Sequence, residues 1–288
     1  MTSPDHQITK SNFQGLTVAA FENRMAAEMT GLIERYGGRP MVTPAMREVP
    51  LEDNREALQF GERLLADQVD VLILMTGVGL ETLIGVLKTR HPLESITEAL
   101  KRITLVARGP KPVAVLKNLG LKPTFTVPEP NTWRELLQTL DNNQPVLGLR
   151  VALQEYGASN AELLEELRER GATLFRVPVY RWALPENLDQ LREALGNILA
   201  GQVDVLLITN AVQVDHAIQM LAKDGGVEQF KQAVKRMVVA SVGPTASERL
   251  RHYGLPVDVE PSHPKMGTLV KETAEQARGL LDKKRAQG

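Results

Sequence analysis

The stretch "VDVLILMTGVG" begins at Val69, and the closely similar stretch "VDVLLITNAVQ" begins at Val203, so that the offset in residue number is 203 − 69 = 134. Each stretch opens with a run that is apolar almost throughout. Such a run is typical of a strand that is buried on both faces of a parallel sheet. Small and polar residues follow it, as in a turn from a strand into a helix. The chain therefore contains the same strand and the same turn twice.

The same offset relates landmarks along most of the chain without a gap. The matched pairs are Gly37 and Gly171, Pro44 and Pro178, Asp70 and Asp204, Gly109 and Gly243, Gly120 and Gly254, and Pro130 and Pro264. A period of this length exceeds the roughly 20–50 residues of solenoid repeats. The sequence thus predicts two similar domains that arose from an internal duplication.

Strands and helices alternate in both copies. The segments "AAEMTGLIERYGG" at 26–38 and "NAELLEELRERGA" at 160–172 have helical spacing and end on glycine, which is a common residue at the end of a helix. Each is followed by a short extended piece, a polar helix and the buried strand. This order predicts an α/β fold with two parallel sheets, each covered by helices on both faces.

Composition excludes several classes of function. The chain has 288 residues with a formal net charge of −1, so no overall field favours nucleic acid or an anionic membrane as a partner. It has no cysteine, which excludes disulfides, thiolate metal sites and cysteine nucleophiles. The five histidines lack metal-ligand spacing. We therefore expect no metal, no nucleic acid and no membrane association.

The start of the chain, "MTSPDHQITKSNFQG", lacks the apolar segment of a secretion signal. No apolar run reaches the roughly 18–20 residues of a membrane span. We expect a cytoplasmic location and a monomeric protein.

The turns that follow the predicted strands are the candidate binding positions. In open α/β sheets, ligands bind at the carboxyl ends of the strands, where helix N-termini present unpaired N–H groups to anions. The candidates are Thr76, Gly77, Val78, Arg108, Gly109, Lys111, Tyr156, Gly157, Thr209, Asn210, Ala211, Gly243, Pro244 and Thr245. Bulky substitutions at Gly77 or Gly243 are expected to displace a ligand or to force a backbone conformation that only glycine adopts at low cost. These turns favour a protein that binds a small polyanion.

Simpler interpretations stay open for these residues. Thr76, Asn210 and Thr245 could each be a plain helix N-cap, and Arg108 and Lys111 could be ordinary surface cations. The "GVG" at 77–79 resembles the start of a dinucleotide-binding fingerprint, but the third glycine position holds a threonine and no acidic ribose partner can be placed. A Walker A sequence is absent from the chain.

Five segments in this order and spacing carry a family resemblance. They are "DVLILMTGVGLETLI" from 70, "ARGPKPVAVLKNLGLK" from 107, "VPVYRW" from 177, "DVLLITNAVQV" from 204 and "VASVGPTASERLRHYGLPVDVEPSHPKMGTLV" from 239. Together they resemble the uroporphyrinogen-III synthase family over nearly the whole chain after about residue 14.

The resemblance implies two α/β domains that are joined by a two-stranded linker, with the ligand cleft between them. One domain would comprise 1–44 and 183–288, and the other 47–177, with linkers near 42–48 and 176–182. The duplication alone would instead place a domain boundary at 141–145.

The implied reaction is the cyclisation of hydroxymethylbilane, with inversion of ring D and loss of water, to uroporphyrinogen III. This is a hydro-lyase step of tetrapyrrole and heme biosynthesis that needs no cofactor. By position, the family's linker tyrosine is Tyr180, a candidate for a modest role in hydroxyl departure. Its threonines match Thr76 and Thr245, whereas Pro112 replaces a further threonine. The alternative is a two-lobed protein that binds small polyanions without catalysis.

Overall fold

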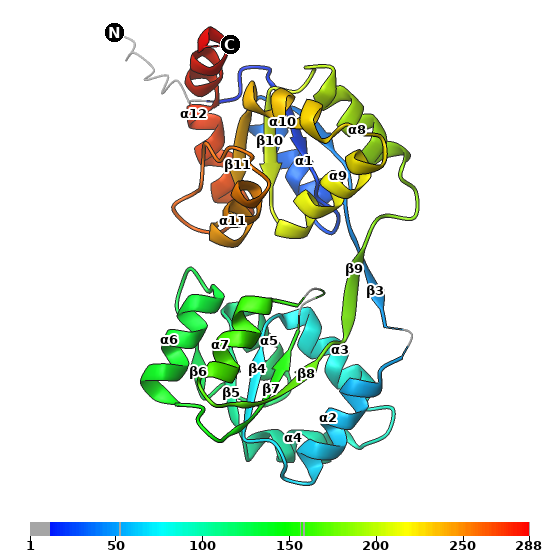
Figure 1. The fold of residues 1–288 in the computed structure, drawn as a ribbon, viewed down its shortest axis with the longest axis vertical. Helices are drawn as coiled ribbons and strands as arrows, with labels where there is room; N and C mark the ends of the chain where they lie inside the picture. Colours follow the sequence, from blue (N-terminus) through cyan, green and yellow to red (C-terminus); the bar gives the residue numbers. More distant parts are fainter. Residues whose placement is uncertain (1–11, 52, 156, 158, 288) are drawn as a thin grey trace, which may run out of the picture. The chain divides into compact units, whose positions relative to one another are not determined.

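A computed structural model of the chain describes residues 12–51, 53–155, 157 and 159–287 (Figure 1). The chain forms two compact units. The first contains residues 1–47 and 184–288, and the second contains residues 48–183. The first unit is therefore assembled from both ends of the chain.

A four-stranded parallel sheet forms the centre of the first unit. Its strands are β1 (Thr17–Ala20), β2 (Arg39–Val42), β10 (Val205–Ile208) and β11 (Val238–Ser241), in the order β11-β10-β1-β2. An isolated parallel bridge between Ala240 and Val259 extends the β11 edge.

Six helices cover this sheet on two faces. They are α1 (Ala26–Arg35), α8 (Asp189–Leu199), α9 (Ala211–Lys223), α10 (Val227–Lys235), α11 (Pro244–His252) and α12 (Met266–Gln287). Helices α8 to α11 share one hydrophobic core with one face of the sheet. Helices α1 and α12 pack on the opposite face.

The second unit is built in the same way around a five-stranded parallel sheet. Its strands are β4 (Val71–Leu74), β5 (Thr104–Ala107), β6 (Phe125–Thr126), β7 (Arg150–Gln154) and β8 (Thr173–Val177), in the order β6-β5-β4-β7-β8. Strands β3 (Arg47–Pro50) and β9 (Tyr180–Ala183) form a separate two-stranded sheet.

Helices also cover both faces of the second sheet. They are α2 (Arg55–Leu65), α3 (Gly77–Leu87), α4 (Leu93–Lys101), α5 (Pro110–Asn118), α6 (Trp133–Asn143) and α7 (Ala161–Glu169). Helices α2 to α5 line one core, and α6 and α7 line the other. All four residues of β4 are buried: Leu72 and Leu74 face the first core, and Val71 and Ile73 face the second. Burial on both faces explains the continuous apolar run, and the predicted α/β fold class is confirmed.

The duplication contains a one-residue shift that the sequence comparison missed. Val205 of β10 pairs with Val18 of β1, and Val71 of β4 pairs with Val151 of β7. The residue numbers of the central strands differ by 205 − 71 = 134, whereas those of their neighbours differ by 151 − 18 = 133. The expectation of a repeat without a gap is therefore wrong at the first strand. The loop that follows β7 has one more residue than the loop that follows β1.

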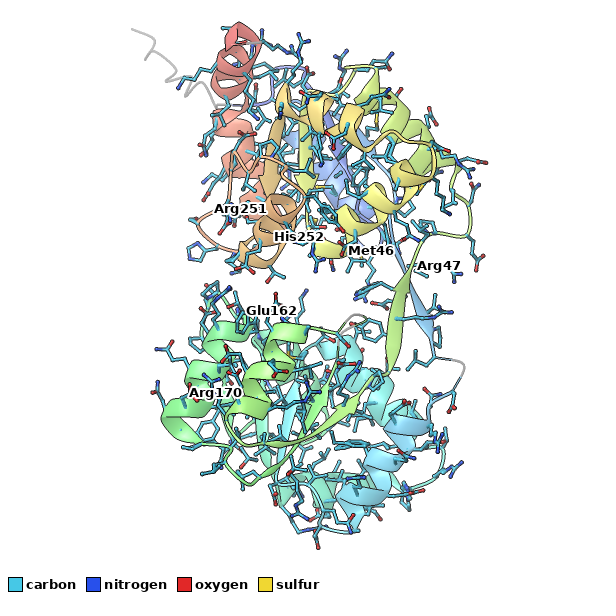
Figure 2. The ribbon with its side chains drawn as sticks, viewed as in Figure 1. Met46, Arg47, Glu162, Arg170, Arg251 and His252 are labelled. Carbon is cyan, nitrogen blue, oxygen red and sulfur yellow. The ribbon has the colours of Figure 1, made fainter. Side chains whose placement is uncertain are left out.

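The duplicated aspartates fasten the starts of neighbouring strands. The Asp70 carboxylate accepts a hydrogen bond from the Arg150 backbone N–H at 2.7 Å, and the Asp204 carboxylate accepts one from the Thr17 N–H at 2.8 Å. Within the first unit, the Arg47 side chain (labelled in Figure 2) donates to the Leu184 carbonyl at 3.2 Å. This bond ties together the two segments at which the chain leaves and re-enters that unit.

Candidate functional site

In the second unit, the turn after β4 begins helix α3. Thr76 is the N-cap in an extended conformation, and its Oγ1 accepts a hydrogen bond from the Gly79 N–H at 3.0 Å. The interpretation of Thr76 as an N-cap is thus confirmed. Among the hydrogen bonds of the described residues, none has the N–H of Gly77 or Val78 as its donor. The helix itself offers no acceptor to these two groups, and Gly77 is buried whereas Val78 is half-buried.

Tyr180 lies next to this turn. Its side chain is 5% exposed, and its hydroxyl oxygen is 3.5 Å from Thr76 Oγ1. The edge of its ring meets the Trp182 ring, with centroids 5.3 Å apart and planes at 82°. The distance between the hydroxyls is at the long limit for a hydrogen bond, so this is a weak polar contact. The structure therefore brings together two residues that the sequence singled out separately.

Gly157, in the loop after β7, packs against Trp182. Gly157 has φ +79°, and a Cβ there would lie 2.4 Å from the Trp182 indole, so the position needs glycine. Tyr156 lies outside the described residues.

A carboxylate that the sequence did not single out anchors this loop. Glu155 is 5% exposed, and its carboxylate accepts two bonds of 2.9 Å from the Arg176 guanidinium and one of 2.9 Å from the Ser159 hydroxyl. The bond to Glu155 raises the pKa of Arg176. Only the fold pairs Glu155 with Arg176, because Glu155 directly follows β7 and Arg176 lies in the neighbouring strand β8.

The turn before α5 touches the turn before α3. A Cβ on Gly77 would lie 2.9 Å from the Lys111 carbonyl oxygen, so the two turns approach each other at backbone distance. Gly109 is the N-cap of α5 with φ +83°, and a Cβ there would lie 2.9 Å from Asn131 Oδ1. Arg108 is half-buried, whereas Lys111 is exposed. Both cations of this turn thus keep some exposed surface, and Lys111 keeps more of it than Arg108.

In the first unit, the turn after β10 begins helix α9. Asn210 is its N-cap and forms a capping box with Gln213, which confirms the capping interpretation. The Thr209 hydroxyl donates to the Glu22 carboxylate at 2.6 Å and accepts from Gln213 Nε2 at 2.8 Å. Thr209 is thus engaged on both sides. Ala211, half-buried at the first helical position, has an N–H that donates to no acceptor within the described ranges.

The turn before α11 corrects two expectations. Gly243 is the N-cap with φ 166°, which is extended backbone that any residue can adopt, and Gly77 is not among the glycines with a left-handed φ. The alternative of a backbone conformation that only glycine adopts at low cost is therefore wrong at both positions, whereas displacement of a ligand stays a prediction. Thr245 lies one residue after Pro244 in the first helical turn, is exposed and makes no capping bond, so the N-cap alternative is wrong for it.

Comparison with known proteins identifies the family. The family model described as uroporphyrinogen-III synthase HemD matches residues 27–271. The chain belongs to the uroporphyrinogen-III synthase family. Membership confirms the lyase class and the role in tetrapyrrole biosynthesis, and it does not favour a binding protein without activity.

Individual relatives align with nearly the whole chain. An uncharacterized protein of Bacillus subtilis (strain 168), YjjA, is 27% identical over 265 residues, which are 91% of this chain and 96% of that protein. Wild-type uroporphyrinogen III synthase from Thermus thermophilus has 25% sequence identity to this chain. Its crystal structure superposes with a TM-score of 0.54 and covers 93% of this chain and 99% of that chain. A mutant of the same enzyme is 23% identical, with a TM-score of 0.67 over 95% and 100% of the two chains, and it supports the fold.

Buried polar side chains pack beneath the turn at the start of α11. Ser241 and Ser247 have no exposed surface, their hydroxyls contact each other, and the Ser247 hydroxyl donates to the Glu260 carboxylate. No periodicity distinguishes these serines from cap residues, so the sequence did not reveal them. Arg251 and His252, labelled in Figure 2, lie at the other end of the same helix.

The described residues contain no group of three or more histidine, aspartate or glutamate side chains that could hold a metal ion. Within the same residues, no helix combines the length and the apolar composition that crossing a bilayer requires.

Proposed function

We propose that this chain converts hydroxymethylbilane to uroporphyrinogen III by closing the ring with inversion of ring D and loss of water. The observation that carries the proposal is the family match over 27–271. The substrate is a linear tetrapyrrole with acetate and propionate side chains, which makes it a polyanion. Helix N-termini at the strand ends of each unit present N–H groups that suit such anionic side chains.

The chemistry balances without a cofactor. The bond between carbon and the terminal hydroxyl breaks, its electron pair leaves with the oxygen, and a proton completes the departing water. The azafulvene that remains is attacked by the substituted carbon of ring D, which gives a spiro intermediate. The bond from this carbon to its original methylene bridge then breaks, and the freed bridge bonds to the unsubstituted α-carbon of ring D. That carbon loses its proton, which balances the proton taken up by the departing water. Because the substrate is inherently reactive, the enzyme acts chiefly by holding the right carbon in place and by stabilising charge.

The second unit supplies carboxylate-binding groups from two adjacent turns. The N–H groups of Gly77 and Val78 lie at the positive end of α3, where an anion is stabilised. The Lys111 ammonium adds a full positive charge at the neighbouring turn. Pro112, at the third helical position, has neither a hydroxyl nor an N–H to donate, so Arg108 and Lys111 replace a hydroxyl contact there with charge, beside the backbone of Gly109.

The first unit supplies a similar set. The N–H of Ala211 at the start of α9, and those of Gly243 and Thr245 at the start of α11, donate to no acceptor in the part of the chain that the structure describes. The exposed Thr245 hydroxyl can add a direct contact.

Tyr180 is the candidate to assist departure of the hydroxyl. Its phenol can donate a hydrogen bond to the leaving oxygen, and the Thr76 hydroxyl lies 3.5 Å from it. We assign it a modest role because the substrate ionises readily.

The proposal extends to the location, the oligomeric state and the cofactor requirement of the protein. We propose a cytoplasmic monomer that works without metal or organic cofactor and does not bind nucleic acid or membranes. Its functional domains are 1–44 with 183–288, and 47–177, linked through 42–48 and 176–182. Light scattering, fractionation and activity after chelation test these points.

The test of the function is product analysis with hydroxymethylbilane as substrate. Spontaneous closure gives isomer I, so a reaction without protein provides the baseline. We expect isomer III in excess, with a rate proportional to protein concentration and unchanged by a chelator. Isomer I alone, at the rate of the control without protein, would contradict the proposal.

A further inference from the structure

Each unit contains a buried glutamine that holds the turn after the central strand. Gln154 has no exposed surface, and its Oε1 accepts hydrogen bonds from the Met75 N–H at 3.2 Å and the Thr76 N–H at 3.3 Å. This carboxamide thus satisfies two successive backbone donors, which would otherwise be buried without an acceptor.

The first unit has the same pair of bonds. Gln213 is 2% exposed, and its Oε1 accepts from the Thr209 N–H at 2.9 Å and the Asn210 N–H at 3.2 Å. Met75 and Thr76 correspond to Thr209 and Asn210 at the offset of the duplication. The bonded donors are therefore equivalent in the two copies.

The glutamines themselves are not equivalent. Gln154 is the last residue of β7, whereas Gln213 is the third residue of helix α9. The strand register makes Phe21 the counterpart of Gln154, and the offset makes Gly79 the counterpart of Gln213. The same carboxamide thus comes from the neighbouring strand in one copy and from the following helix in the other.

Space at the turn shows why one copy cannot contain both glutamines. A Cβ on Gly79 would lie 1.9 Å from Gln154 Nε2. Gly79 therefore leaves the volume that the Gln154 carboxamide fills, and a side chain there would compete with it. The two units form the same pair of hydrogen bonds with glutamines at different positions. This indicates that the bonds themselves are required, and not a glutamine at one particular position.

We propose that Gln154 and Gln213 are positioning residues of the synthase reaction, an inference that rests on the proposed function. By turning two N–H groups inward, each glutamine fixes the first turn of its helix. The next N–H groups, those of Gly77, Val78 and Ala211, stay directed to substrate carboxylates. In the second unit, the same bonds hold Thr76 beside Tyr180.

The experiment transfers the arrangement of the first unit into the second. Gln154→Ala removes the acceptor, Gly79→Gln crowds it, and the double variant moves the carboxamide to the helix, as at Gln213. Gly85→Gln is the matched control, because a Cβ at Gly85 meets nothing within 4 Å in the same helix. Turnover, KM and the ratio of isomer III to isomer I are measured for all four variants.

We expect each single variant to lose on the order of tenfold in turnover, as the loss of a buried hydrogen bond implies, and to release more isomer I. The double variant should recover to within about threefold of wild type, since coupled residues are not additive. A double variant that is no better than the poorer single variant overturns the proposal. So do folded single variants with wild-type turnover and isomer ratio, which would leave only a structural role.

Two further measurements keep the outcomes distinguishable. If Gln154→Ala does not fold, Gln154→Phe, which places the residue type of Phe21 at this position and lacks the acceptor, replaces it in the same comparison. Urea unfolding of the four variants tests the exchange of the carboxamide without any substrate. Wild-type protein that makes no isomer III overturns the proposed function and the positioning role with it, whereas failure of the double variant beside an active wild type overturns the positioning role alone.

Discussion

The hydroxyl oxygens of Thr76 and Tyr180 lie 3.5 Å apart, although 104 residues separate them in the sequence. Thr76 caps the helix after the central strand, and Tyr180 opens β9. The contact places a phenol beside the turn at the start of α3. The proposed proton donor and the proposed carboxylate-binding turn thus lie next to each other within the second unit.

Thr76→Ala removes both the cap and the contact with Tyr180. We expect a loss of about 1 kcal/mol in the free energy of unfolding, the usual effect of losing an N-cap. Thr76→Ser keeps the hydroxyl and should retain most of that stability. Urea denaturation compares the two variants, and equal unfolding midpoints for them would contradict the capping role.

Gly77→Val tests the backbone approach between the two turns of the second unit. The new Cβ would meet the Lys111 carbonyl at 2.9 Å, which forces α3 and α5 apart and shifts the carboxylate-binding N–H groups. A displacement of about 1 Å can reduce turnover on the order of 100-fold. Gly85→Val in the same helix is the control, since that position is open. Similar turnover in both folded variants would argue against this binding turn.

Thr245→Ala separates ligand contact from stability. Thr245 is exposed and caps nothing, so its truncation should change the free energy of unfolding by less than about 0.5 kcal/mol. Any fall in turnover then reports a contact with the substrate. Asn210→Ala, which removes a cap, should cost about 1 kcal/mol by the same denaturation assay. A Thr245→Ala variant as unstable as Asn210→Ala would refute this distinction.

The fold was predictable because its signals are local. In the runs after Val69 and Val203, successive side chains point to opposite faces of the sheet and both faces are buried, so every residue must be apolar. Gly37 and Gly171 follow the ends of their helices with a positive φ, which favours glycine. The one-residue shift at β1 was missed because the clearest landmarks all lie after that strand. It became visible only through the pairing of Val18 with Val205.

The site was less predictable because its contacts are not local. Thr76 and Asn210 follow capping rules that operate within one turn, so a sequence can reveal them. The pairing of Glu155 with Arg176, and that of Gln154 with the turn at Thr76, depend on which strands become neighbours. The positions of Gly243 and Thr245 in their turn depend on backbone angles that the "GPT" sequence does not specify.

Asp70→Asn tests how an ion pair contributes to acid sensitivity. The hydrogen bond from the Arg150 side chain holds the pKa of the Asp70 carboxyl below its ordinary value of 3.8. A lowered pKa stabilises the folded state above the ordinary value, and this stabilisation disappears as the pH falls through the folded pKa. We therefore expect the variant to be less stable than wild type at neutral pH and the difference to shrink as the pH falls below 3.8. A difference that grows on acidification would contradict the assignment.

The central claim is that catalysis depends on positioning by the turns more than on one acid. The most direct measurement is the rate of isomer III formation by folded Tyr180→Phe, beside Gly77→Val and the reaction without protein. A positioned general acid contributes about 10²–10⁴-fold, and here we predict a loss of about 100-fold or less, with isomer III still the main product. If Tyr180→Phe falls to the uncatalysed rate while Gly77→Val stays near wild type, acid catalysis dominates and the account is wrong.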